Sequence, residues 1–161
     1  MENAITFLLT HTIKLRPAMN DLETAKNQLV QEQLTLIIVK NGEILFATQS
    51  PRISGILTAI EEIGRDLEGA SIADKVVGKA VALLCVYAGI IAVFAETLSR
   101  NAIDVLEQRH VEVEWKRLVD NILDTSKKDV CPFEREATNI ADPKEAYNKF
   151  KILQQKLRAC K

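Results

Sequence analysis

Three charged residues interrupt an apolar stretch near the middle of the chain. The segment "SIADKVVGKA" contains Asp74, Lys75 and Lys79. Ser71 is followed three residues later by Asp74, a spacing similar to a capping box, and the apolar run that follows ends at Gly89. The sequence therefore predicts a helix that begins at Ile72, is apolar nearly all round and is buried.

On such a helix the charged residues share one side of the first two turns. At about 100° per residue, these positions and Gly78 fall within an arc of roughly 140°. Free backbone N–H groups at a helix start attract an anion, two ammonium groups would strengthen the attraction, and Gly78 would let a phosphate or carboxylate approach closely. We predict four ligand-binding residues, which are Ser71, Lys75, Gly78 and Lys79. The alternative is that Asp74 is only a cap and that both lysines extend their apolar stems to solvent.

A second candidate is the segment "CPFE", from Cys131 to Glu134. Pro132 favours the first position of a helix, which places Cys131 directly before the helix start. A thiol at that position commonly has a depressed pKa, so Cys131 is a candidate nucleophile, with Glu134 or Asp74 as the general acid or base. The alternative is that Cys131 is a small, semi-buried cap and that Glu134 completes the capping arrangement of the same helix.

The sequence does not predict a metal or cofactor site. A catalytic zinc site needs three protein ligands, mostly Cys and His, and the only histidines are His11 and His110, neither of which is near a cysteine in the sequence. There is no dinucleotide-binding glycine motif, no P-loop and no nucleophile elbow. We therefore expect no metal and no cofactor.

The periodicity of the chain predicts a mixed α/β domain. An amphipathic helix is expected over residues 20–33, with Asn20 or Asp21 as its cap, and another over residues 53–63. Two apolar runs, at residues 34–40 and 43–49, are separated by Asn41 and Gly42, the dipeptide that most favours a two-residue hairpin turn. The rest of the predicted elements are a buried strand at 90–98, a helix at 100–109, a strand at 111–115, a loop at 121–130 and helices at 131–139 and 142–157. The strand–helix–strand order within this series is typical of a parallel sheet.

Length and composition favour one soluble domain. The chain has 161 residues, 47% of them hydrophobic and 27% charged, and we expect a single domain at residues 21–158 after an extension at residues 1–20. The net charge of −1 gives no general attraction for nucleic acid. The longest uncharged run, residues 80–95, is shorter than a membrane span needs. Three widely spaced cysteines and no signal-peptide pattern favour a cytoplasmic location.

Several segments together resemble one protein family. They are "LTLIIVKNGEILF", "GASIADKVVGKAVALL", "AVFAETLS", "VEVEW", "CPFE" and "DPKEAY". The resemblance covers about residues 21–150, and it is to an uncharacterised prokaryotic family of domains of unknown function with a cytidine deaminase-like fold. It implies a three-layer α/β/α domain with a mixed central sheet.

The same resemblance implies where a site would lie. Deaminases begin one active-site helix with a His-Ala-Glu type sequence and another with Pro-Cys-x-x-Cys, and these supply the zinc ligands and the proton carrier. The corresponding segments here read "IADK" and "CPFE", so the zinc-binding motifs are missing. The resemblance then implies that Asp74 and Lys75 face Cys131 and Glu134 across one pocket.

Three hypotheses about function follow. The first is that the domain binds a small anionic or nucleotide-like metabolite between two helix N-termini, with or without catalysis by Cys131. The second is a non-catalytic ligand-sensing or regulatory module. The third is an interaction protein or homo-oligomer, in which the apolar residues 1–16 and the last helix pack against another copy or a partner.

Overall fold

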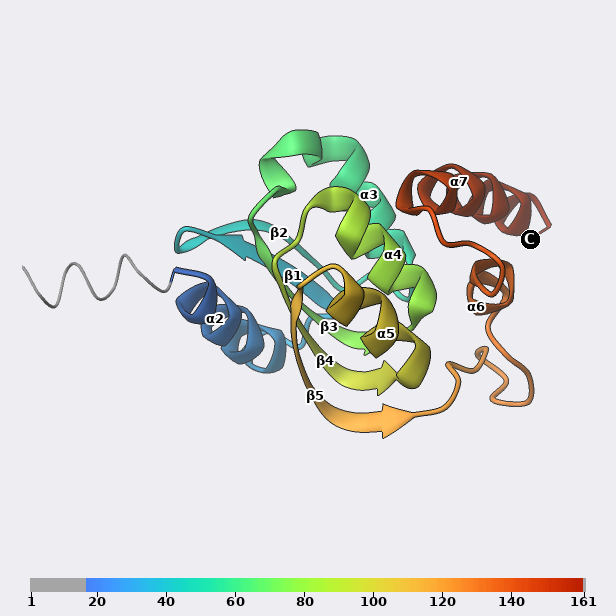
Figure 1. Ribbon diagram of the computed structural model, residues 1–161, viewed down its shortest axis with the longest axis horizontal. Coiled ribbons are helices and arrows are strands. Elements are labelled where there is room, and N and C mark those ends of the chain that lie inside the picture. The colour runs from blue at the N-terminus through green and yellow to red at the C-terminus, as the bar shows by residue number, and fades with distance from the viewer. Residues whose placement is uncertain (1–16, 161) are drawn as a thin grey trace, which may run out of the picture.

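A five-stranded mixed sheet forms the centre of the domain (Figure 1). The computed structural model describes residues 17–160, so most of the predicted extension, including His11, lies outside the described residues. The strands are β1 (Leu36–Lys40), β2 (Glu43–Thr48), β3 (Ser71–Val77), β4 (Ala92–Ser99) and β5 (Glu112–Val119), in the spatial order β2-β1-β3-β4-β5. β1 is antiparallel to both β2 and β3, whereas β3, β4 and β5 are parallel.

Helices cover both faces of the sheet and give the predicted three layers (Figure 1). They are α2 (Pro17–Gln31), α3 (Ser54–Ile63), the short 3-10 helix η1 (Gly64–Leu67), α4 (Lys79–Ala88), α5 (Arg100–Gln108), α6 (Pro132–Ala137) and α7 (Pro143–Ala159). α2 packs alone against β1, β3 and β4 on one face, and α3, α4 and α5 cover the other. α6 and α7 pack against α4 from outside. The predicted α/β fold class is confirmed.

The predicted hairpin is confirmed, and its turn explains why. Asn41 and Gly42 both have positive φ, 52° and 79°, the conformation that a turn matching the strand twist requires. Their backbone N–H groups donate to the buried carboxylate of Asp21, at 2.8 and 2.9 Å. The predicted role of Asp21 or Asn20 as a helix cap is wrong, because α2 already begins at Pro17. Asp21 instead fixes the hairpin to α2.

The helix predicted from Ile72 is wrong in its first part. Residues 71–77 form β3, which pairs with β1 on one side and β4 on the other, and α4 begins only at Lys79. A central strand buried on both faces is apolar on successive residues, a pattern that periodicity cannot distinguish from a buried helix. Ser71 and Asp74 are therefore strand residues and not a capping box.

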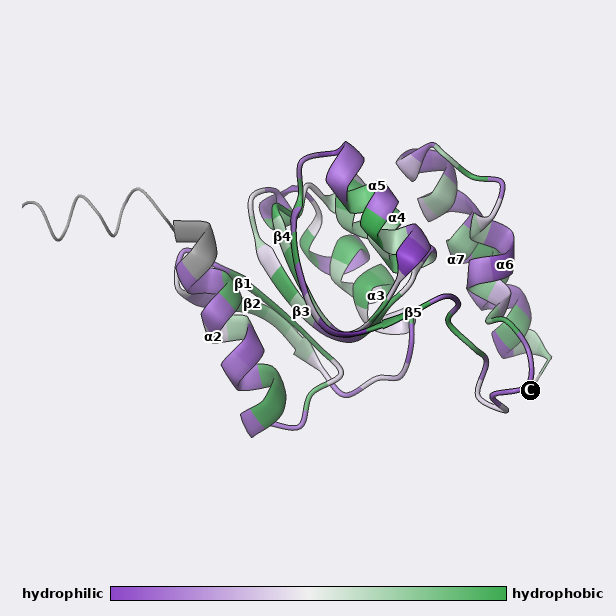
Figure 2. Ribbon diagram, turned by 60° about the horizontal axis from the view of Figure 1, so that its bottom comes forward, coloured by the Kyte–Doolittle hydropathy of each residue, from purple (hydrophilic) through white to green (hydrophobic). Residues whose placement is uncertain are grey.

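The remaining elements follow the predicted order with small changes of boundary. β4, α5 and β5 form the expected parallel strand–helix–strand unit, and α4 ends as predicted at Gly89, whose φ of 78° closes the last turn. α6 is shorter than predicted, since it ends at Ala137. Figure 2 shows hydrophobic residues along the strands that α2 and α4 cover, with hydrophilic residues on the outer surfaces of α2, α5 and α7. No helix within residues 17–160 is both long and apolar enough to span a membrane.

Candidate functional site

A cavity of about 280 Å³ lies where β3 ends and α4 begins. Its walls come from the end of β3, the start of α4, the loop before α3, the segment after β5 and the start of α6. Five predicted site residues line it, namely Asp74, Lys75, Gly78, Cys131 and Glu134, together with Thr35, Pro51, Arg52, Ile53, Val76, Ala80, Val81, Ile122, Leu123 and Phe133. The carboxyl ends of parallel strands are where open α/β sheets commonly bind ligands.

Asp74 is a buried carboxyl group on the wall of this cavity. The residue is only 6% exposed, and Oδ1 of its carboxyl group accepts a hydrogen bond from the N–H of Val76 at 3.1 Å. Burial raises the pKa of Asp74 to about 7, against the opposing effect of backbone hydrogen bonds from Val76 and Lys75. Near neutral pH Asp74 therefore exists in both protonation states and can donate or accept a proton.

Glu134 caps α4, although it belongs to α6. Oε2 accepts a hydrogen bond from the N–H of Lys79 at 3.0 Å, and Oε1 accepts one from the N–H of Ala80 at 2.9 Å. Burial raises the pKa of Glu134, while these two hydrogen bonds and the charge of Lys79 lower it. We expected a helix start at Ile72 to attract a ligand anion; the helix begins at Lys79 instead, and its start already binds an internal carboxylate. The alternative interpretation, in which Glu134 completes the capping of α6, is wrong, because Glu134 caps the neighbouring helix.

Gly78 makes this capping contact possible. It is the N-cap residue of α4, and a Cβ atom there would lie 2.3 Å from Oε1 of Glu134. Any larger residue would occupy the space of the carboxylate. The glycine therefore permits a close approach by Glu134, whereas we predicted a close approach by a ligand.

Cys131 lies directly before Pro132, the first residue of α6, as predicted. The residue is 7% exposed, and Sγ lies 3.6 Å from Nη1 of Arg52. Cys131 is the N-cap residue of α6, a helix of only six residues, as the alternative interpretation proposed, although its side chain makes no capping hydrogen bond. Arg52 gives no sequence signal, yet its backbone has a φ of 62°, in the left-handed region where non-glycine residues are uncommon.

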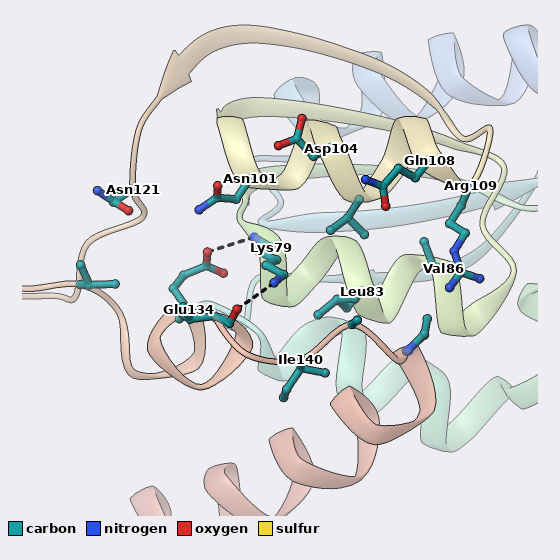
Figure 3. Close-up of a pocket in the computed structure, with 15 residues that line it drawn as sticks. Lys79, Leu83, Val86, Asn101, Asp104, Gln108, Arg109, Asn121, Glu134 and Ile140 are labelled. Carbon is teal, nitrogen blue, oxygen red and sulfur yellow. Dashed lines mark hydrogen bonds between the residues drawn. The ribbon is translucent and has the colours of Figure 1, made fainter.

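Two predicted ligand-binding residues point elsewhere. Ser71 is fully buried at the opposite end of β3 from the cavity. The ammonium group of Lys79 donates a hydrogen bond to the carbonyl oxygen of Thr138 at 3.2 Å and lines a neighbouring cavity of about 430 Å³ between α4, α5 and the α6–α7 segment (Figure 3). Glu134 lies on the wall of both cavities. Lys75, by contrast, is exposed at the end of β3 and lines the first cavity.

The site does not fit the zinc that deaminases use. Among residues 17–160, no group of three or more His, Cys, Asp or Glu side chains is placed to hold a metal ion. The cavity offers one thiol and two carboxyl groups, and one of those carboxyls is already hydrogen bonded to two backbone N–H groups. The residues that line the cavity include three with protonatable side chains, Asp74, Cys131 and Glu134, and two with cationic side chains, Arg52 and Lys75.

The three cysteines are expected to react with iodoacetamide at different rates. Cys160 is exposed and should react first, whereas Cys131 should react more slowly because its thiol lies in the cavity wall. Cys85 should be slowest, since it is fully buried and its pKa is raised by burial and by the charge of Asp74. Peptide mass spectrometry over a time course measures the three rates, and a urea-unfolded sample is the control. Faster labelling of Cys131 than of Cys160 would contradict this order and indicate an activated thiolate.

Comparisons with known proteins identify one family. A family model described as a domain of unknown function (DUF1893) matches residues 24–157. The crystal structure of a DUF1893 family protein from Thermotoga maritima is similar to this chain with a TM-score of 0.75 and 23% identity, over 85% of this chain and 90% of that chain. No curated protein matches the chain.

Two deaminases are more distantly similar in structure. A dCMP deaminase from the cyanophage S-TIM5 has a TM-score of 0.43 and 18% identity, over 63% of this chain and 95% of its own. A diaminohydroxyphosphoribosylaminopyrimidine deaminase and 5-amino-6-(5-phosphoribosylamino)uracil reductase from Thermotoga maritima has a TM-score of 0.44 and 20% identity, over 72% of this chain and 40% of its own. Similarity at this level says nothing about the chemistry of the present cavity.

Proposed function

The chain belongs to the DUF1893 family of domains of unknown function, and from the geometry of its cavity we propose that it binds a small nucleotide-like metabolite. One observation carries this proposal: the same cavity is lined by two carboxyl groups, Asp74 and Glu134, and by two cationic residues, Arg52 and Lys75. Such a combination suits a ligand with hydrogen-bond donors at one end and an anionic group at the other.

The interior of the cavity suits a planar, base-like group. Asp74 can accept a hydrogen bond when ionised and donate one when protonated, and its raised pKa makes both forms available near neutral pH. Ile53, Val81 and Phe133 supply apolar walls, against which a flat ring can pack. With about 280 Å³, the cavity is at the small end of ligand sites, so a single nucleoside unit is favoured over a dinucleotide.

The two cationic residues suit a phosphate or carboxylate. Lys75 is exposed at the end of β3, and Arg52 places its guanidinium group beside Cys131. A guanidinium group binds phosphate through paired hydrogen bonds, and an ammonium group adds a second positive charge. We therefore assign anion binding to these two side chains and not to the N-terminus of α4, because the carboxylate of Glu134 already binds that helix start.

We favour binding without turnover over catalysis by Cys131. A cysteine nucleophile is activated by a neighbouring cation or by a base that accepts its proton, and the side chain that hydrogen bonds to the Cys131 thiol is the cation Arg52, so the base is the part that catalysis would still need. A catalytic form of the proposal would assign Cys131 as the nucleophile and Asp74 as the general acid or base. Asp74 suits that role better than Glu134, whose oxygens already bind two backbone N–H groups.

Isothermal titration with matched nucleosides and nucleoside monophosphates tests the proposal. Lys75→Ala should weaken monophosphate binding by about 10-fold or more, because a charge-assisted hydrogen bond is lost, and should leave nucleoside binding unchanged. Lys149→Ala is the control, since that lysine lies on α7 and pairs with Glu145. Equal weakening of both ligands, or no binding of either by the unmodified protein, would contradict the proposal. Product formation detected by mass spectrometry would establish turnover.

A further inference from the structure

β5 forms one edge of the sheet, and its outer side is unpaired among the described strands (Figure 1). The strand has eight residues, and four successive ones, Glu114, Trp115, Lys116 and Arg117, are exposed. Trp115 is the only tryptophan of the chain and is 41% exposed. A long edge strand with an exposed aromatic residue is a template for pairing with another strand.

The backbone of β5 has a defined set of free hydrogen-bonding groups. The N–H of Glu112 donates to the carbonyl oxygen of Ile91 at 3.0 Å, so Glu112 faces β4. The register with β4 is constant along the strand, and hydrogen-bonding direction alternates between successive residues. The N–H and C=O groups of Val113, Trp115 and Arg117 consequently point outward from the sheet.

We propose that two copies of this chain form a dimer through antiparallel pairing of their β5 strands, with Trp115 opposite the partner's Trp115. In this register the outward residues form hydrogen-bonded pairs, Trp115 with the partner's Trp115 and Val113 with the partner's Arg117. Glu114 then lies opposite the partner's Lys116, at a non-hydrogen-bonded position where side chains are closest. Because the dimer is two-fold symmetric, this charge pair occurs twice.

The charge sequence of β5 favours this register over its neighbours. Centring the pairing on Glu114 or on Lys116 places each of these residues opposite its own copy, and centring it on Val113 places Glu112 opposite Glu114. Centring it on Arg117 places two guanidinium groups opposite each other. Like charges in direct opposition destabilise a strand pair. Of the registers centred on residues 113–117, the one about Trp115 sets Glu114 opposite Lys116 and places no like charges opposite each other.

The two faces of the paired strands also fit. Glu114 already binds Lys26 of α2 at 2.8 Å, so the partner's Lys116 would complete a cluster of two cations around one exposed carboxylate. On the other face the two Trp115 rings would pack side by side and lose their exposure to water. The opposite edge strand, β2, has Glu43 as its only charged residue and cannot form such pairs.

Sedimentation velocity of the full chain tests the proposal with two charge variants. The unmodified protein should be a dimer. Glu114→Lys and Lys116→Glu each create two like-charge pairs, so each alone should weaken dimerisation by about 10-fold or more. An equimolar mixture of the two variants should dimerise again, because each lysine then meets a glutamate of the other chain. Restoration on mixing separates the register from any folding defect, and circular dichroism checks that each variant is folded.

Tryptophan fluorescence gives an independent measurement. Since Trp115 is the only tryptophan, its emission should shift to shorter wavelength as protein concentration rises through the dimer range. A monomer at all concentrations would overturn the proposal, and so would a dimer that the single variants leave unchanged. Weaker dimerisation of both single variants without recovery on mixing would rule out the register centred on Trp115.

Discussion

Replacing Gly78 with alanine should lower the free energy of unfolding by about 2 kcal/mol, the combined scale of a lost N-cap and of hydrogen bonds to a charged group. The new Cβ atom would lie 2.3 Å from Oε1 and 2.4 Å from Cδ of Glu134. The backbone of Gly78, with a φ of −100°, accepts any residue, so the cost does not come from the backbone. It comes from moving the Glu134 carboxylate off the N–H groups of Lys79 and Ala80.

A double-mutant cycle with Glu134→Ala separates this cause from ordinary crowding. Without the carboxylate the alanine at position 78 has room, so Gly78→Ala in the Glu134→Ala background should be neutral or slightly stabilising. Glu134→Gln should have an intermediate effect, because its amide oxygen can still accept one of the two hydrogen bonds. Urea unfolding monitored by circular dichroism gives the four free energies. Additive effects of the two substitutions would show that Gly78 and Glu134 are not coupled.

The sequence correctly predicted those turns and helix ends whose conformation depends on the residues at that point of the chain. The hairpin was predicted because Asn41 and Gly42 adopt the positive φ values of its turn whatever surrounds them. The end of α4 was predicted from Gly89 for the same reason. β3 was misread, since residues 71–77 are strand residues only because β1 and β4 pair with them on both sides. Nothing within the segment itself distinguishes it from a buried helix.

Residues that we predicted to share one site do line one cavity, but the secondary structure that we predicted for some of them was wrong. Asp74, Lys75, Cys131 and Glu134 do line one cavity, but the first two lie at the end of a strand, where successive side chains point to opposite faces, and not at a helix start. The capping of α4 by Glu134 joins residues 54 and 55 positions apart, so no spacing rule could reveal it. Arg52 was missed because a lone arginine in a loop carries no pattern.

The stability of the protein should fall as pH rises from about 4 to 7, and Asp74→Asn should remove most of this dependence. The carboxyl of Asp74 has its ordinary pKa of 3.8 in the unfolded chain and a pKa of about 7 in the folded protein, so the folded state binds more protons between these values. Stability therefore decreases with rising pH across this window and levels off above it. The full difference corresponds to about 4 kcal/mol at 1.36 kcal/mol per pKa unit.

Asparagine is a suitable replacement because it has the shape of the protonated acid and its oxygen can still accept the hydrogen bond from Val76. Urea unfolding at pH 4, 5.5, 7 and 8 should give equal stabilities for the two proteins at pH 4 and an increasing advantage for Asp74→Asn above it. Asp124→Asn is the control: a hydrogen bond from Ser126 lowers the pKa of this exposed carboxyl below its usual 3.8, so its contribution is lost only below about pH 4, and the substitution should leave the dependence between pH 4 and 8 unchanged. Parallel pH profiles for the unmodified protein and Asp74→Asn would mean that water or a structural change relieves the burial of Asp74. In that case the cavity would not hold a carboxyl group that changes protonation near neutral pH, and the base-like end of the proposed ligand would have to bind through other groups.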